Sequence, residues 1–184
     1  SNTNERTLVF SLFTKNTFIG NTINISKPKK YSLINNQIIT QEKSLEITLF
    51  SLAIFNSLVI DYIARFMIQI HANKTYLMRL PIPQPSAEEI NNNPIYKKLM
   101  LNALKLTLYY NYEDFKELAE KFNLKKEDIP KTDKQLDLMK IENDCLVAKL
   151  YDINLEELKH ICLGFKVLKN KYPQYLEMLL DKYE

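Results

Sequence analysis

The chain has 184 residues, of which 46% are hydrophobic, 26% are charged and only two are glycine. This length and apolar content suit one domain, or one and a half, with a real hydrophobic core, and they exclude a disordered tail. The scarcity of glycine argues against a glycine-rich phosphate loop and against an all-β protein with many tight turns. Cys145 and Cys162 are too few for a disulfide framework, so we expect a reducing compartment, the cytoplasm.

Basic charge is concentrated in the first half of the chain. Residues 1–85 hold 9 Lys and Arg against 4 Asp and Glu, a net charge of +5. Residues 86–184 hold 16 against 18, a net charge of −2. A polyanionic partner would therefore meet the first half.

The chain contains no evident signal peptide or membrane span. It does not begin with Met, and from Thr3 onward it reads as the middle of a larger protein. The most apolar stretch, residues 47–60, is free of charge for 14 residues, fewer than the roughly 18–20 that a membrane span needs. We interpret this stretch as part of a buried helix.

Residues 1–85 predict a small sheet and one long helix. Strands are expected over residues 6–13 and 17–25, with a third short strand within 31–39, because β-branched residues are frequent there. Over residues 44–69 apolar side chains recur at threes and fours and occupy most other positions too, which predicts a helix buried on several sides. Residues 74–80 are expected to be extended, and the proline-rich run 81–85 ends this region.

Everything after residue 85 is expected to be helical. Ser86 and Glu89 have the spacing of a capping box, and Asn93 followed by Pro94 predicts a helix that runs to about residue 110. Further helices are predicted over residues 114–122, 134–151, 155–162 and 173–183. The sequence therefore predicts an α+β fold in which residues 1–85 form a small β-sheet packed on a long buried helix and residues 86–184 form an all-helical C-terminal subdomain.

Two short motifs have a chemical and a structural interpretation. The run N-P-I-Y over residues 93–96 is similar to the N-P-P-Y with which amino-methyltransferases hold a flipped base, but it lacks the second proline, so we interpret it as a helix start. His160 and Cys162, with Cys145 further off, lack a second clustered ligand pair, so we interpret the sulfur atoms as helix packing and predict no metal site.

Carboxylates are frequent over residues 113–120, where they alternate with lysines at helical spacing. This pattern is typical of a solvated helix face, and no nucleophile is paired with a base. The sequence therefore predicts no catalytic residue in this chain.

Lysine and arginine suit phosphates, whereas asparagine, glutamine and arginine suit base edges. Such residues are scattered through the first half. From composition alone a solvated surface is the default interpretation; if the chain meets a nucleic acid, we predict that the residues on or near the binding face are Lys15, Lys27, Lys29, Lys30, Lys74 and Arg79. Arg65 is a weaker candidate, because Asp61 lies one turn earlier at the spacing of an ion pair.

Three segments of the chain carry motifs that match one known protein family. The first is T-N-E-R-T-L-V over residues 3–9, followed by N-T-F-I-G-N-T over 16–22. The second is L-A-I-F-N-S-L-V-I-D-Y-I-A-R over 52–65, which leads to H-A-N at 71–73 and L-P-I-P at 80–83. The third is L-V-A-K-L-Y-D-I-N-L-E-E-L-K-H-I over 146–161. In this order the three segments resemble the C-terminal half of type IIG restriction-modification enzymes, which are adenine-specific DNA methyltransferases, and the third is similar to the late helix-turn-helix of that family.

The second segment is the most specific, and it also resembles helices in the recognition domains of type I specificity subunits. The positions that match the family are Asn56, Ser57, Asp61, Arg65, His71, Asn73, Leu80, Pro81 and Pro83. The departures are Asp152 and Asn154 in place of Gly and Thr, Ile70 in place of Thr, and residues 74–76 in place of an aromatic pair.

The resemblance implies a target-recognition region that positions double-stranded DNA for an upstream methyltransferase domain of the same chain. The parent enzyme would transfer a methyl group from S-adenosylmethionine to adenine N6 and could also cut DNA. The present chain is expected to bind no cofactor, to contact no membrane and not to be an enzyme itself. The alternative is a structural or interaction module that packs on the methyltransferase domain without binding DNA.

A structural role is expected for six of the motif residues, Asn56, Ser57, Asp61, Arg65, Pro81 and Pro83. Asn56 and Ser57 lie inside a mostly apolar helix, where an unpaired amide is costly. We expect them to bond to the backbone of the extended segment before Pro81.

Overall fold

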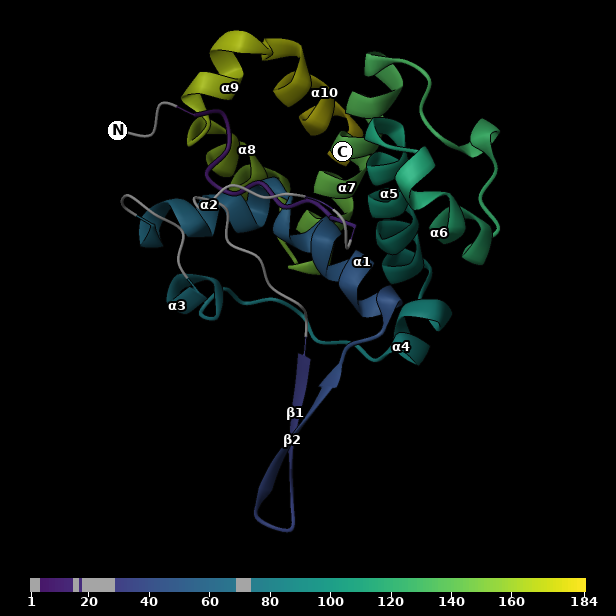
Figure 1. Ribbon diagram of the computed structural model, residues 1–184. Helices are drawn as coiled ribbons and strands as arrows, with labels where there is room; N and C mark the ends of the chain where they lie inside the picture. The colour runs from purple at the N-terminus through teal and green to yellow at the C-terminus, as the bar shows by residue number, and fades with distance from the viewer. Residues whose placement is uncertain (1–3, 15–16, 18–28, 69–73) are drawn as a thin grey trace.

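The computed structural model describes residues 4–14, 17, 29–68 and 74–184. These residues form a mainly helical body and one two-stranded antiparallel sheet (Figure 1), which confirms the α+β class and the helical C-terminal part. The strands are β1 (Lys29–Ile34) and β2 (Gln37–Glu42). The α-helices are α1 (Leu45–Phe55), α2 (Leu58–Met67), α3 (Lys74–Leu77), α4 (Ala87–Asn92), α5 (Pro94–Tyr110), α6 (Lys116–Lys121), α7 (Asp133–Leu150), α8 (Leu155–Leu163), α9 (Lys166–Lys171) and α10 (Pro173–Tyr183), with single 3-10 turns at Glu113–Phe115 and Lys126–Asp128.

Side-chain caps begin several helices, and the two expected at Ser86 and Asn93 are present. Ser86 and Glu89 form a capping box at α4, and Asn154 and Glu157 form one at α8. The Asn93 side chain accepts from the backbone N–H groups of residues 95 and 96 at the start of α5, which has Pro94 in its first turn. The N-P-I-Y run is thus a helix start. Helix α9 was not predicted.

One hydrophobic core joins the helices. Helix α1 packs along α5, and α7 lies between α5, α10 and α2. Phe50 and Ile54 of α1, Leu104 of α5, Val147 of α7 and Leu179 of α10 are fully buried in one cluster. The predicted regions 1–85 and 86–184 therefore share a single core.

The long helix expected over residues 44–69 is two helices. Helices α1 and α2 meet at an angle of 69°. Ser57 has an extended backbone, and its hydroxyl accepts from Ile60 N (3.3 Å) and donates to Ile54 O (2.7 Å). A serine hydroxyl that caps a new helix competes with the helical backbone ladder, so the apolar run breaks at this point.

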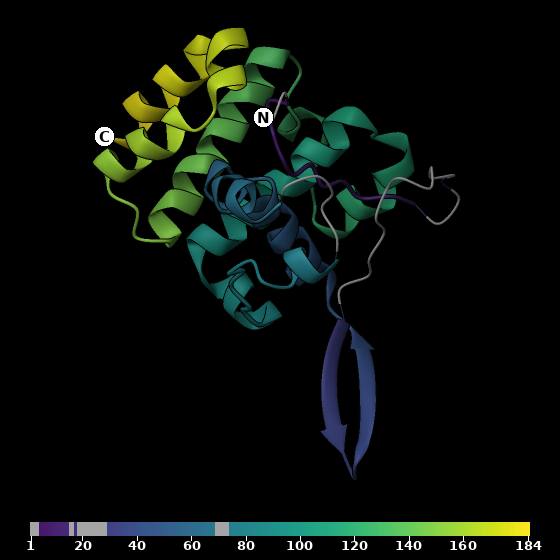
Figure 2. The ribbon, with the colours of Figure 1, turned by 90° about the vertical axis from the view of Figure 1, so that its left-hand side faces the viewer.

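The sheet differs from the one expected. The segment predicted as one strand over residues 31–39 is a hairpin with a turn at Asn35–Asn36, and within residues 4–14 the expected first strand is irregular. Most of the expected second strand, residues 18–25, lies outside the described residues. Figures 1 and 2 show the hairpin projecting from the helical body, so it does not pack on α1 as predicted. Residues 74–80, predicted to be extended, begin with the short helix α3.

Among the described residues, no single helix is long and apolar enough to cross a bilayer. Only the bent pair α1 and α2 together reaches the length and hydropathy of such a span.

Candidate nucleic-acid interface

The projecting hairpin has two exposed faces of different chemistry. In a strand, alternate side chains point to opposite faces. The cross-strand pairs Lys30–Gln41, Ser32–Ile39 and Ile34–Gln37 make up one face, which we call the polar face. The pairs Lys29–Glu42, Tyr31–Thr40 and Leu33–Ile38 make up the other, which we call the apolar face. Leu33 and Ile38 are 71% and 74% exposed, so the helical body does not cover the apolar face.

The tip of the hairpin consists of Asn35 and Asn36. Their φ angles are 51° and 61°, the left-handed conformation that both central residues of a type I′ turn need and that asparagine tolerates. The turn twists with the strands and presents two side-chain amides at the end of the hairpin. Two asparagines between β-branched runs were a signal of this turn in the sequence.

Four of the six predicted DNA contacts are described. Lys29 and Lys30 lie on β1, Lys74 lies on α3, and Arg79 follows α3; all are exposed. Helix α3 lies at the lower edge of the helical body in Figure 1, the edge from which the hairpin projects. Lys15 and Lys27 lie outside the described residues.

The four described candidate contacts have no ion pair, whereas some lysines of the second half do. Within the described part of the chain, none of Lys29, Lys30, Lys74 and Arg79 forms an ion pair. Five lysines of the second half do, with carboxylates 2.7–3.7 Å away: Lys98, Lys126, Lys140, Lys159 and Lys171. The carboxylates over residues 113–120 are exposed, as predicted for a solvated helix face. The hairpin and the region around α3 therefore carry four cations without an ion pair among the described residues, and Glu42 lies opposite Lys29 in the hairpin.

A second feature is the attachment of the N-terminal segment, residues 4–14, to the helices. Asp61 is buried, and its Oδ1 accepts from the backbone N–H of Thr7 (2.7 Å) and of Leu8 (2.6 Å). Asn56 accepts from Phe10 N (2.9 Å) and donates to Phe10 O (3.0 Å). Side chains of the α1–α2 corner thus satisfy main-chain groups that a sheet would otherwise pair.

Arg65 completes this attachment. Its Nε donates to Asp61 Oδ2 (3.0 Å), which is the ion pair expected from the i,i+4 spacing. The guanidinium also donates to the carbonyl oxygens of Gly164 (3.0 Å) and Glu5 (2.7 Å), and it lies 4.1 Å from the centre of the Phe165 ring. Because its donors already bind groups within the chain, Arg65 has a structural role here.

Asp144 of α7, which the sequence interpretation missed, lies at the centre of the same network. Its Oδ1 accepts from Leu58 N (2.7 Å), and its Oδ2 accepts from Tyr175 Oη (2.8 Å) and Arg6 Nη2 (3.3 Å). Burial raises the pKa of the Asp144 carboxyl, and the charge of Arg6 opposes that rise. An aspartate on the buried face of a predicted helix was the signal that could have identified it.

The motif residues therefore make structural contacts, but Asn56 and Pro81 have other partners than expected. Asn56 contacts Phe10 instead of the segment before Pro81, because the α1–α2 corner faces the N-terminal segment. Pro81 instead accepts from the Tyr151 hydroxyl through its carbonyl oxygen (2.5 Å), while Pro83 continues the irregular run into α4.

No catalytic constellation is evident among the described residues. No group of three His, Cys, Asp or Glu side chains within them is placed to hold a metal ion. Cys145 and Cys162 are buried, and burial raises the pKa of their thiols to about 11 and about 12. A scan against protein-family models and searches of curated proteins and of solved structures find no match to this chain.

Proposed function

We propose that this chain is the DNA-recognition region of a larger restriction-modification enzyme. The observation that carries the proposal is the free-standing hairpin, which has unpaired lysines on its first strand and amide side chains on its polar face and tip. A two-stranded ribbon fits the major groove of B-DNA, which is about 12 Å wide. In this proposal Lys29 and Lys30 meet phosphates, while Asn35, Asn36 and Gln37 face base edges.

The contacts between motif segments support the resemblance on which the proposal draws. Residues of the N-S-x-x-x-D-x-x-x-R segment bind the backbone of the T-N-E-R-T-L-V segment, through Asp61 to residues 7 and 8 and through Arg65 to residue 5. Two segments that resemble one family thus form one structural unit. The methyltransferase domain that would complete a DNA cleft is proposed to precede this unit in the parent enzyme.

The test is duplex DNA binding by the 184-residue chain, measured by fluorescence anisotropy between 50 and 300 mM salt. We expect affinity to fall as salt rises, because lysines release counterions from phosphates. The double reversal K29E/K30E should lower the slope of log affinity against log salt by about 2, since each lost phosphate contact lowers it by about 0.9.

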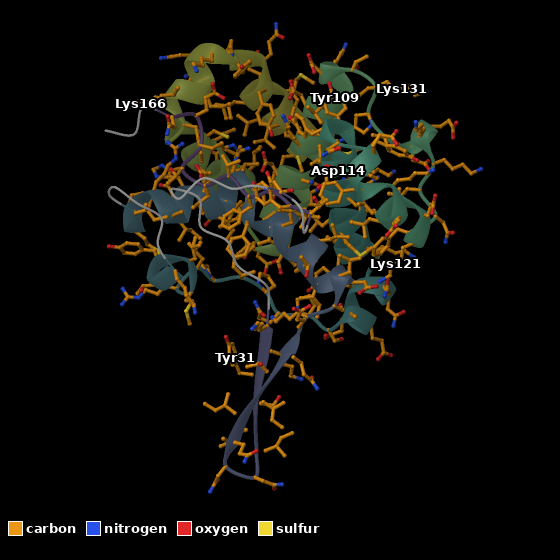
Figure 3. The ribbon with its side chains drawn as sticks, viewed as in Figure 1. Tyr31, Tyr109, Asp114, Lys121, Lys131 and Lys166 are labelled. Carbon is orange, nitrogen blue, oxygen red and sulfur yellow. The ribbon has the colours of Figure 1, made fainter. Side chains whose placement is uncertain are left out.

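A matched control is K166E/K169E on α9, at the opposite end of the molecule from the hairpin (Figures 1 and 3). Both lysines are exposed, so this control changes the net charge by the same amount and should leave the salt slope unchanged. The proposal would be refuted if both double reversals lowered the salt slope equally. It would also be refuted if the unsubstituted chain bound no DNA at 50 mM salt, or bound it with an affinity that does not change with salt.

The apolar face of the hairpin favours a second function, a module that only packs on the methyltransferase domain. Tyr31, Leu33 and Ile38 are exposed there, and exposed apolar clusters commonly mark protein contacts. The variant L33S/I38S separates the two functions. DNA binding that persists in this variant, while K29E/K30E lowers the salt slope, supports DNA recognition by the hairpin.

A further inference from the structure

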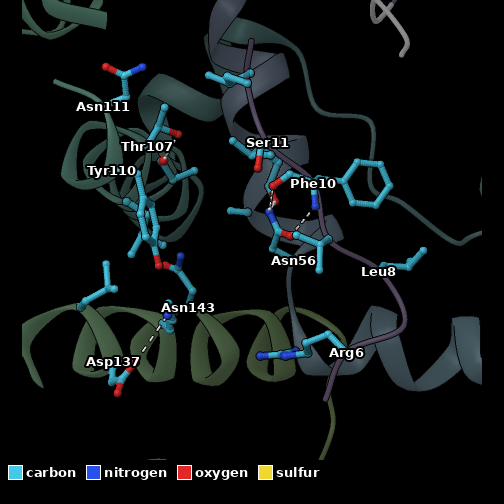
Figure 4. A pocket seen from close by; sticks show the side chains of 18 of the residues that line it. Arg6, Leu8, Phe10, Ser11, Asn56, Thr107, Tyr110, Asn111, Asp137 and Asn143 are labelled. Atoms are coloured by element: carbon cyan, nitrogen blue, oxygen red, sulfur yellow. Dashed lines mark hydrogen bonds and ion pairs between the residues drawn. The ribbon is translucent and has the colours of Figure 1, made fainter. Parts of the chain in front are cut away.

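A groove separates the N-terminal segment from the helical body. It has a volume of about 930 Å³, near the upper end of the range of about 300–1,000 Å³ for ligand pockets. Figure 4 shows Phe10 and Ser11 on one wall, Thr107 and Tyr110 of α5 on the other, and Asp137 and Asn143 of α7 along the floor.

The wall formed by the N-terminal segment has an unpaired backbone edge. The Asn56 amide binds both N–H and C=O of Phe10, which point the same way only when that residue is extended. In an extended chain the same groups of the two neighbouring residues, Val9 and Ser11, point the opposite way. Both residues line the groove, and within the described residues their backbone groups have no hydrogen-bond partner.

The charge of the groove indicates what it binds. Its lining includes two cations, and both are already paired: Arg6 with Asp144 (3.3 Å) and Lys140 with Asp137 (3.4 Å). Asp114 and Asp133 also line the groove. Their hydrogen-bond partners, the Asn111 amide and the Tyr109 hydroxyl, are neutral, and no described cation pairs with either. The groove therefore complements a positively charged occupant.

We infer that this groove binds an extended, basic polypeptide segment that adds as a strand along residues 9–11, where the backbone groups of Val9 and Ser11 are unpaired within the described residues. The backbone of the segment pairs with the N–H and C=O groups of Val9 and Ser11, the mode in which peptides add to an exposed strand edge. Its lysine or arginine side chains meet Asp114 and Asp133, and its apolar side chains meet the leucines of the groove. This inference is independent of the proposed DNA contact, which lies on the hairpin.

The probe is the acetylated and amidated peptide Val-Lys-Val-Lys-Val-Lys-Val, titrated into the 184-residue chain by calorimetry without DNA. We expect it to bind at least tenfold more tightly than the same peptide with glutamate at each lysine. The variant Ser11→Pro removes one edge N–H without removing a bond within the protein, and it leaves Phe10 in the extended conformation that precedes proline. It should weaken binding at least tenfold, whereas Ser11→Ala should bind as the parent does.

If Ser11→Pro does not fold, a second measurement tests whether the peptide pairs with the Ser11 backbone. Amide hydrogen exchange of the unsubstituted chain should slow at Ser11 when the lysine peptide is added. The inference is overturned if the lysine peptide does not bind, if the glutamate peptide binds equally well, if folded Ser11→Pro binds normally, or if exchange at Ser11 is unchanged.

Discussion

Replacement of Asp61 by alanine tests whether one carboxylate attaches the N-terminal segment. Asp61→Ala removes the acceptor of two backbone N–H groups, at 2.7 and 2.6 Å, and the partner of Arg65, at 3.0 Å. A hydrogen bond to a charged group contributes about 1.5–3 kcal/mol, and removing one partner of a buried ion pair costs about 3–5 kcal/mol. Because these effects overlap, we expect the free energy of unfolding to fall by about 3–5 kcal/mol.

The assay is urea unfolding, followed by circular dichroism. For a slope of roughly 2 kcal/mol per molar urea, the expected loss moves the midpoint by about 2 M. Amide exchange at Thr7 and Leu8 should accelerate more than exchange in α5. Asp61→Asn retains an acceptor oxygen but loses the charge opposite Arg65, so its loss should be intermediate.

Asp181 on α10 provides the control, because its side chain is exposed. Asp181→Ala should change the free energy of unfolding by less than about 0.5 kcal/mol. A loss below about 1 kcal/mol for Asp61→Ala, or unchanged exchange at Thr7 and Leu8, would refute the attachment argued here.

Three further substitutions or modifications have expected outcomes. Asn56→Ala loses two exposed hydrogen bonds to Phe10, so it should lower the free energy of unfolding by about 1–2 kcal/mol and leave the DNA affinity within twofold. Abolished DNA binding at unchanged stability would contradict the structural role of Asn56. A Cβ at Gly164 would lie 3.0 Å from the Tyr62 ring and 3.1 Å from Ile161 O, so Gly164→Ala should cost about 1–2 kcal/mol in urea unfolding, and an unchanged midpoint would count against this packing. Burial raises the pKa of the Cys145 thiol to about 11 and that of the Cys162 thiol to about 12. Alkylation by iodoacetamide at pH 8, measured by mass spectrometry, should therefore be slow in the native chain and fast in urea. Since the folded thiols keep protons that unfolded thiols lose above about pH 9, stability should fall as pH rises from 9 to 11; rapid native alkylation would refute their burial.

Most helices after residue 85 could be predicted because their signals are local, whereas α9, which has no side-chain cap, was not. Ser86 with Glu89, Asn93 with Pro94, and Asn154 with Glu157 act within one turn. Such caps depend little on the rest of the fold.

The N-terminal half could not be predicted in the same way, because its conformation depends on distant partners. The β-branched run over residues 6–13 has the composition of a strand, yet side chains 46 to 54 positions away bind its backbone instead of a neighbouring strand. The bend at Ser57 is similarly accompanied by a bond from Leu58 N to Asp144, 86 positions away. No local pattern contains those partners.

The way in which Asp61 and Asn56 hold the N-terminal segment has a consequence for sequence variation. Within the N-terminal segment, the two side chains bind main-chain atoms of Thr7, Leu8 and Phe10, atoms that every residue except proline supplies. The identities of Thr7 and Phe10 can therefore change over generations without loss of these bonds, while Asp61 and Asn56 cannot be exchanged for residues without the same acceptor. We expect Asp61 and Asn56 to be invariant and Thr7 to vary, with proline excluded from positions 7, 8 and 10.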